Sequence, residues 1–174
     1  MAGFQVHRIT NAAVYIDGNS FYGKASEIDL GTIKAVTSDF ESLGMIGLIE
    51  LPDGVDKLEG KVIWNSEYRE VAQKVATPFI SRQLQCRSSI DVHTSQGRVQ
   101  ELPMVTLMTV MFKEFQLGTY KPRTPTTYET PFSATYIRQL VNGRETVMFD
   151  YLANIYRVDS KDMMSKYRKN LGLS

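Results

Sequence analysis

Apolar and polar residues alternate along the segment from residue 79 to residue 94. One set of alternate positions is apolar: Leu84, Cys86, Ile90 and Val92. The other set is polar or charged: Gln85, Arg87, Ser89, Asp91 and His93. Successive side chains of a strand point to opposite faces of its sheet, so this period of two predicts a long strand with one apolar and one polar face.

Three further segments rich in β-branched and aromatic residues predict long strands, at 98–116, 132–141 and 144–157. Asn142-Gly143 separates the last two, and both residues tolerate the positive φ that a type I′ hairpin turn requires. Ser95-Gln96-Gly97 connects the first of these segments to the alternating one. We therefore expect two antiparallel hairpins, 79–94 with 98–116 and 132–141 with 144–157.

The first part of the chain has weaker strand patterns. Val14 and Ile16 alternate with polar positions in a predicted hairpin over residues 12–24, whose turn is Gly18-Asn19. Further strands are expected at 31–40 and 58–64.

Two short helices are predicted. An apolar stripe at Tyr68, Val71, Ala72 and Val75 has the helical spacing, with Asn65 or Ser66 as the expected N-cap. A C-terminal helix is expected over 160–169, capped by Asp159 or Ser160 and with Met163, Met164 and Tyr167 on its apolar side.

The segment between residues 41 and 58 is apolar without a regular period. Pro52-Asp53-Gly54 predicts a turn within it, because proline presets φ and glycine accepts a left-handed conformation. The segment could lie in the core, which its composition favours. Alternatively it could be a projecting arm that only a neighbouring molecule covers.

Length and composition are typical of one globular domain, with 174 residues, 43% of them hydrophobic. We expect neither a transmembrane helix nor a secretory signal, and the single cysteine fits a reducing compartment. Residues 1–60 carry nine acidic and four basic side chains, about −5, and the remainder about +6. This asymmetry arises by chance, or else it indicates a subunit whose complementary faces meet head to tail.

No arrangement typical of catalysis or metal binding is present. The sequence has neither a phosphate-binding glycine loop nor a nucleophile elbow, and His7, His93 and Cys86 form no spaced ligand set. Cys86 falls on the apolar face of its strand, which is typical of a buried, inert thiol. We therefore expect no catalytic residue, no metal and no cofactor.

Several motifs together resemble one family, the major tail tube proteins of contractile-tailed bacteriophages, which R-type pyocins and related contractile injection systems share. NAAVYIDGNSFYG, at residues 11–23, is similar to the family's opening hairpin. LGMIGLIELPDG, at 43–54, and the following KLEGKVIW resemble its glycine–methionine–glycine arm and return strand. YRKNLGL, at 167–173, is similar to its closing arginine-rich motif.

The resemblance implies a mainly β (α+β) fold. This is an antiparallel β-sandwich or partial barrel with one packed α-helix and a C-terminal helix, as a single tail-tube domain over 1–174. It also implies a structural protein without enzymatic activity, whose hexameric rings share a continuous inner β-barrel and stack head to tail into a hollow tube. Implied partners are the tail sheath, baseplate and tail terminator proteins, and DNA that passes through the lumen without sequence recognition. The implied location is the virion tail, assembled in the host bacterial cytoplasm without a membrane anchor.

Three surfaces are assigned as hypotheses. The polar face of 79–94 is the candidate lumen lining: Gln85, Arg87, Ser89, Asp91 and His93. The arm, 40–58, is the candidate contact between rings: Gly44, Met45, Ile46, Gly47, Leu48, Pro52, Asp53 and Asp56. The C-terminal helix is a candidate sheath contact through Lys166, Arg168 and Lys169, and the proline- and threonine-rich loop 117–131 either faces the sheath or only connects strands.

Two other classes of protein remain as alternatives. The first is a monomeric β-barrel or sandwich that binds a small ligand. The second is a β-rich enzyme, which the absence of an acid, base or nucleophile cluster disfavours.

Overall fold

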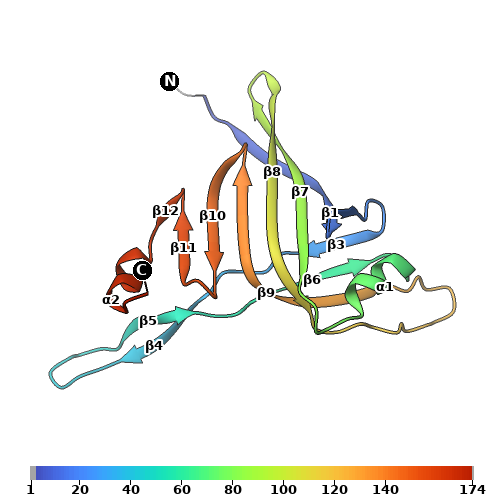
Figure 1. Cartoon of the computed structure of the whole chain (residues 1–174). Helices are drawn as coiled ribbons and strands as arrows, with labels where there is room; N and C mark the ends of the chain where they lie inside the picture. Colours follow the sequence, from blue (N-terminus) through green and yellow to red (C-terminus); the bar gives the residue numbers. More distant parts are fainter. Residues whose placement is uncertain (1–2, 174) are drawn as a thin grey trace.

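A large, curved antiparallel sheet forms the body of the protein (Figure 1). The computed structural model describes residues 3–173, so the ends of the expected domain, 1–2 and 174, lie outside the described residues. The strands of this sheet are β1 (Val6–Ile16), β2 (Asn19–Ser20), β3 (Ala25–Asp29), β6 (Leu58–Trp64), β7 (Arg82–Thr94), β8 (Gly97–Phe112), β9 (Tyr128–Val141), β10 (Arg144–Asp150), β11 (Ile155–Val158) and β12 (Lys161–Asp162). Eight of them follow the order β12-β11-β10-β9-β8-β7-β1-β2.

Strand β9 belongs to both layers of the sandwich. Its second half pairs with β10, whereas its first half pairs with β6, from Trp64↔Tyr128 to Leu58↔Ala134. β6 in turn pairs with β3, so β3 and β6 form a second layer that faces β1, β7 and β8. The fold is thus an open sandwich rather than a closed barrel.

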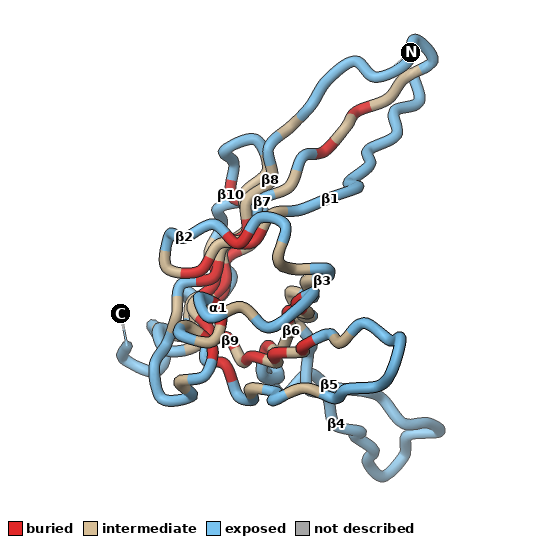
Figure 2. The backbone as a smooth tube through the Cα atoms, turned by 90° about the vertical axis from the view of Figure 1, so that its right-hand side faces the viewer, coloured by how far each residue is buried: buried red, intermediate tan, exposed pale blue. Residues whose placement is uncertain are grey.

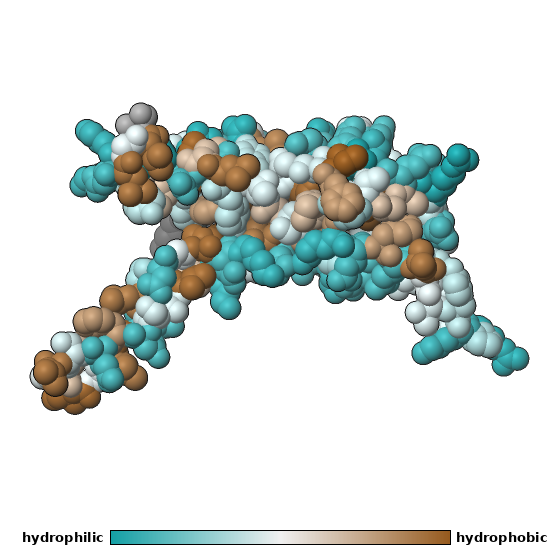
Figure 3. Space-filling model, turned by 60° about the horizontal axis from the view of Figure 1, so that its bottom comes forward, coloured by the Kyte–Doolittle hydropathy of each residue, from teal (hydrophilic) through white to brown (hydrophobic). Residues whose placement is uncertain are grey.

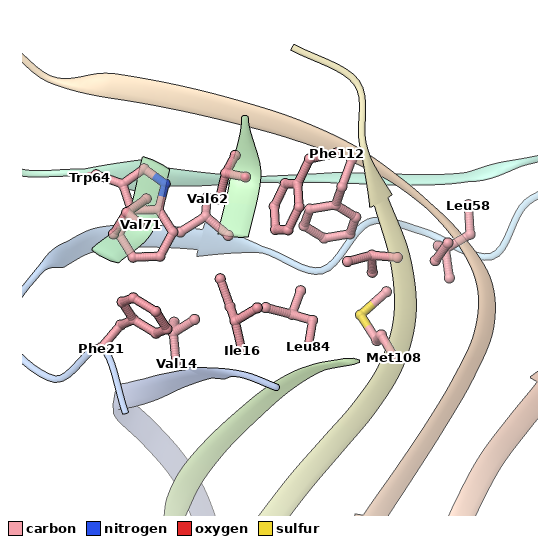
Figure 4. Close-up of a cluster of buried hydrophobic side chains, with 14 of the residues drawn as sticks. Val14, Ile16, Phe21, Leu58, Val62, Trp64, Val71, Leu84, Met108 and Phe112 are labelled. Atoms are coloured by element: carbon pink, nitrogen blue, oxygen red, sulfur yellow. The ribbon is translucent and has the colours of Figure 1, made fainter. Parts of the chain in front are cut away.

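The hydrophobic core lies between these layers (Figure 4). Its largest fully buried side chains are Trp64, Phe112 and Phe132. The rings of Phe112 and Phe132 meet edge to face with their centroids 6.0 Å apart. Trp64 donates a hydrogen bond of 2.9 Å from Nε1 to Oγ1 of Thr130, which satisfies its only polar atom.

Helix α1 (Arg69–Val75) packs Val71 and Val75 into the core, as the apolar stripe predicted. The predicted cap is wrong, because Tyr68 occupies the N-cap and makes no side-chain cap bond. Asn65 instead extends the sheet, since its N–H donates to the carbonyl of Lys24 at 2.8 Å.

An ion cluster holds α1 against the sheet. The Asp17 carboxylate accepts hydrogen bonds from Lys74 Nζ at 3.1 Å, Arg82 Nη1 at 3.2 Å and the N–H of Gln83 at 3.0 Å. Partial burial raises the pKa of Asp17, but the hydrogen bonds and the two positive charges outweigh it and lower that pKa overall.

The Asn142-Gly143 turn is confirmed, with φ of 49° and 75°, and it joins β9 to β10. The first hairpin turns one residue earlier than predicted, at Asp17-Gly18, because Asn19 pairs with Ile16. The predicted hairpin of 79–94 with 98–116 is confirmed as β7 with β8.

The predicted strand at 144–157 is in fact two strands. β10 ends at Asp150, whose Oδ1 accepts hydrogen bonds of 3.0 Å from the N–H groups of Leu152 and Ala153 and so stabilises a turn before β11. Asp159 and Ser160 both have positive φ and join β11 to β12, so neither caps a helix. Helix α2 (Ser165–Asn170) is therefore shorter than the predicted 160–169.

Strands β4 (Ala35–Phe40) and β5 (Ile49–Val55) form a separate hairpin, hereafter the arm, that projects away from the body (Figure 1). Every residue of both strands is exposed, so placing this segment in the core is wrong. Pro52-Asp53-Gly54 is not a turn either. It lies within β5, where Pro52 pairs with Thr37, Gly54 pairs with Val36, and Asp53 is the extra residue of a β-bulge.

Trp64→Ala is expected to lower the free energy of unfolding by about 3–5 kcal/mol, because it removes a fully buried ring from the centre of the core. Urea unfolding followed by circular dichroism measures the change. Tyr22→Ala is the control, since Tyr22 is 84% exposed and its loss is expected to change stability by less than about 0.5 kcal/mol. Equal effects of the two substitutions would contradict this core.

Asp17→Asn tests the ion cluster through its pH dependence. The pKa of Asp17 is lower in the folded chain than in the unfolded chain, so its stabilisation is present above about pH 4 and is lost as the pH falls through the folded-state value. Asparagine tolerates the φ of 49° at this position. We expect the variant to be less stable by about 1–2 kcal/mol at pH 7, with the difference shrinking below about pH 4. A difference that stays constant from pH 7 to pH 3 would refute the assignment.

Candidate functional site

The arm has two chemically different faces, and both are exposed. Its register pairs Phe40 with Ile49 and Ser38 with Leu51, which places the aromatic ring and two aliphatic side chains on one face. The other face carries Thr37, Asp39 and Glu50, and the Thr37 hydroxyl donates to Glu50 Oε1 at 2.6 Å. A two-stranded hairpin is marginally stable alone in water. The arm is therefore suited to packing against another molecule.

Most of the predicted ring-contact residues gather at the tip of the arm. Gly44, Met45, Ile46, Gly47 and Leu48 connect its two strands, and Ile46 is fully exposed while Leu48 is 61% exposed. Figure 3 shows this tip as a cluster of hydrophobic side chains at the lower left, far from the body.

The remaining predicted ring-contact residues lie nearer the body. Pro52 and Asp53 are in β5. Asp56 is at the base of the arm, where its carbonyl accepts a hydrogen bond of 2.8 Å from the Tyr151 hydroxyl. Asp56 thus anchors the arm rather than extending the surface of its tip.

The polar face of β7 lies on the side of the sheet away from the core. Leu84, Cys86, Ile90 and Val92 are buried, whereas none of the candidate lumen residues Gln85, Arg87, Ser89, Asp91 and His93 is buried. Across the β7–β8 pairing, Gln85 faces Leu107, and Asp91 faces Glu101. The outer face is thus continuous over both strands.

Opposite charges neutralise one another on this outer face. Arg98 pairs with Asp91 at 3.4 Å and with Glu101 at 2.7 Å. The Arg87 guanidinium lies over the Tyr15 ring, 5.6 Å from its centroid.

A second ion cluster on the same sheet was not predicted. Glu145 accepts hydrogen bonds from Arg138 Nε at 2.8 Å and from Arg157 Nε at 2.9 Å, and its side chain is only 5% exposed. Arg138 and Glu145 lie on either side of the Asn142-Gly143 turn. The register of that hairpin, read together with their opposite charges, was the signal that could have revealed the pair.

The three basic residues proposed for sheath contact differ in their surroundings. Arg168 is occupied within the chain, because it bonds Asp162 through Nη2 at 2.5 Å and donates to the Asn154 carbonyl at 3.0 Å. The hydrogen bond from Arg168 lowers the pKa of Asp162. Lys166 and Lys169 are exposed and form no ion pair among the described residues, so only these two are available to a partner.

An open cleft of about 420 Å³ lies between β3 and the inner face of β1, β7 and β8. Its walls include Ile28, Met104 and Cys86. Burial raises the pKa of the Cys86 thiol, which keeps it protonated and unreactive. Within residues 3–173, no group of three or more histidine, cysteine or carboxylate side chains is placed to hold a metal ion. The helices described there are also too short to cross a membrane.

Comparison with solved structures places this fold among contractile injection systems. A chain of the sheath–tube complex of the PVC extracellular contractile injection system, in its extended state, superposes with a TM-score of 0.52 at 9% identity, covering 74% of this chain and 87% of that one. A chain of the PVC sheath/tube terminator, in its extended state, superposes with a TM-score of 0.53 at 8% identity, covering 74% of this chain and 92% of that one. At such low identities these likenesses concern the fold alone. No curated protein sequence matches significantly.

The sequence also matches a family profile over nearly its whole length. Residues 6–172 match the family described as "Phage tail tube protein FII". The match includes the opening hairpin, the arm and all but the last residue of the closing YRKNLGL motif, the segments on which the resemblance was based. The chain therefore belongs to the phage tail tube protein FII family, and it is a structural tail tube subunit rather than an enzyme.

Proposed function

We propose that this subunit forms hexameric rings that stack head to tail into a hollow tube. Each subunit contributes its long strands to a shared inner β-barrel, and the tube is the inner conduit of a contractile tail. DNA passes through it, or the tube itself pierces a target envelope.

Unpaired strand edges support ring formation. One edge of β1 pairs with β7, but among the described residues its other edge pairs only at Tyr15 and Ile16, with β2. β8 likewise pairs with β9 only from Met104 onward, so its first residues have only β7 as a neighbour. Figure 2 shows these parts of β1, β7 and β8 rising together above the rest of the molecule, with β1 and β8 exposed there. Exposed edges of this length invite pairing with another chain, and closure into a ring with identical neighbours satisfies them.

The exposed apolar surface of the arm is the main support for the proposal. The side chains of Phe40, Ile49 and Leu51 are 46%, 46% and 41% exposed, in addition to the apolar residues of the tip. A monomer rarely maintains such a surface, whereas burial against an adjacent ring would stabilise it by roughly 25 cal/mol per Å² of apolar area. We assign the arm to the contact between rings.

The outer face of β7 is proposed to line the lumen, through Gln85, Arg87, Ser89, Asp91 and His93. Its polar side chains suit a water-filled channel, and the ion pairs among its charged groups reduce attraction to a passing polymer. Such a surface would let DNA pass without sequence recognition.

Contacts with a sheath and a terminator are proposed by analogy with the solved neighbours, which come from a sheath–tube complex and a terminator. Contact with a baseplate is proposed from the family resemblance alone. Lys166 and Lys169 on α2 are the candidate sheath contacts. The subunit would then be located in the tail of a virion or related particle, after assembly in the host cytoplasm.

The alternative of a monomeric ligand-binding barrel is not favoured. Family membership indicates a tail tube subunit, and the cleft beside β3 belongs to a sheet that does not close within one chain. Size-exclusion chromatography and electron microscopy of the purified protein distinguish the two. Rings and rods are expected, and a species of 19.7 kDa that persists at high concentration would refute the proposal.

Ile46→Asp combined with Leu48→Asp is expected to abolish tube formation, because carboxylates at the tip cannot be buried against a neighbour without a large desolvation cost. The stability of the isolated subunit should change by less than about 0.5 kcal/mol, since residues 41–48 at the tip are all exposed. Phe79→Asp is the control outside the arm, at a side chain that is 96% exposed. Normal tubes from the double variant, seen by negative-stain microscopy, would rule out the arm as a contact.

A further inference from the structure

The loop between β8 and β9 has the opposite charge to the arm. Residues 116–127, hereafter the basic loop, contain Lys121 and Arg123 and no carboxylate. The arm, from Ala35 to Val55, contains four carboxylates and no basic residue: Asp39, Glu41, Glu50 and Asp53. The two segments thus form a pair of complementary projections on one subunit.

Hydrogen bonds within the basic loop give it a defined shape. The hydroxyls of Tyr120 and Tyr128 lie 2.9 Å apart, and this hydrogen bond raises the pKa of Tyr128 to about 12. Thr126 Oγ1 donates to the Thr119 carbonyl at 2.9 Å and ties the two limbs of the loop together.

A tight turn places the basic residues at the end of the loop. The N–H of Thr124 donates to the carbonyl of Lys121 at 3.3 Å, with Pro122 as the first central residue of the turn. Arg123, the second central residue, has a φ of 58°, which a type II turn requires and a residue other than glycine seldom adopts. The turn therefore holds both cations in solvent at a fixed position.

The charges of the arm and the basic loop take part in no ion pair among the described residues. Neither Lys121 nor Arg123 forms an ion pair among residues 3–173, and the same is true of the four carboxylates of the arm. On the body, by contrast, Asp17, Glu145 and Asp162 are each held by arginine. Unpaired charges of opposite sign on two separate projections indicate a contact that is made between molecules.

The two projections leave opposite sides of the body. In Figure 1 the arm extends to the lower left, whereas the segment that joins β8 to β9 extends to the lower right. They cannot meet within one copy, but copies placed side by side in a ring would bring the arm of each toward the basic loop of the next. Such a contact is heterologous, and rotation about the ring axis repeats it until the ring closes.

We propose that the acidic face of the arm, formed by Thr37, Asp39 and Glu50, docks on Lys121 and Arg123 of a second copy in the same ring. Leu117 and Tyr120, 82% and 70% exposed, flank the cations and add apolar area to the contact. The inference rests on the proposed ring assembly and identifies one contact within it. The opposite, apolar face of the arm remains free for the adjacent ring.

A charge swap tests the contact. Asp39→Lys with Glu50→Lys, or Lys121→Glu with Arg123→Glu, should each raise the protein concentration needed for ring formation by at least about tenfold, because like charges would face one another. The chain that carries all four substitutions should form rings at a protein concentration within about threefold of that needed by the wild type. Analytical ultracentrifugation measures these concentrations, and wild-type assembly should also weaken as salt increases.

The control is a double charge reversal of the same kind away from both projections. Arg144→Glu with Lys161→Glu reverses two exposed charges at the starts of β10 and β12 and should leave assembly unchanged. If the wild type forms rings but the fourfold variant assembles no better than either double variant, the arm–loop contact is wrong while the proposed function stands. If the wild type forms no rings, the proposed function itself fails.

Covalent trapping gives an independent measurement. In a Cys86→Ser background, Asp39→Cys combined with Arg123→Cys should give, on oxidation of assembled rings, a ladder of disulfide-linked oligomers up to the full ring. A mixture of the two single-cysteine chains should yield disulfide-linked dimers. Either chain alone should yield far fewer linked dimers. Absence of the ladder from rings that are visible by microscopy would overturn the contact.

Discussion

The pairing of β9 with strands on both layers is the constraint on which the rest of the structure depends. The first half of β9 bonds to β6 and its second half to β10, so a single strand fixes how the two layers face each other. Gly60 of β6 lies between its neighbouring strands β3 and β9, where a Cβ atom would be 2.3 Å from the Asp29 carbonyl and 2.6 Å from the ring of Phe132, its partner on β9. Glycine permits this approach, and Phe112 and Phe132 then close the core beside it.

What this core stabilises is only the centre of the molecule. The β4–β5 hairpin, one edge of β1 and the start of β8 extend beyond it, and their backbone or apolar groups lack partners within the described chain. A domain that functions alone would satisfy these groups internally, since unpaired strand edges and apolar patches favour aggregation. In the ring proposed above, the same groups would be the means of assembly. The stable body would hold them in position, and identical neighbours would complete them.

Charges on the arm and the basic loop differ from the ion pairs of the body. Several carboxylates of the body are held by cations of the same chain, as Asp17 is by Lys74 and Arg82, and these pairs orient elements against one another. The charges of the arm and the basic loop form no ion pair among residues 3–173. Salt bridges that are exposed contribute little to the stability of a monomer, but unpaired charges on facing surfaces select the partner and the orientation in which it binds.

Local chemistry determined the elements that the sequence alone identified: the long strands from their period of two, the β9–β10 turn from Asn142-Gly143, and α1 from its apolar stripe. Composition alone favoured a core position for the arm over a projecting one, because it records that side chains are apolar but not which surface will cover them. Local patterns also predicted one continuous strand through residues 151–154, where Asp150 instead stabilises a turn. They predicted a helix cap at Asp159, which in fact lies in a turn with positive φ. Only the tertiary structure decided that the arm leaves the body, that Glu145 meets two arginines, and that the acidic and basic projections lie on opposite sides. Those relations join residues that are distant in sequence, and they depend on the packing of the two layers, which no local pattern encodes.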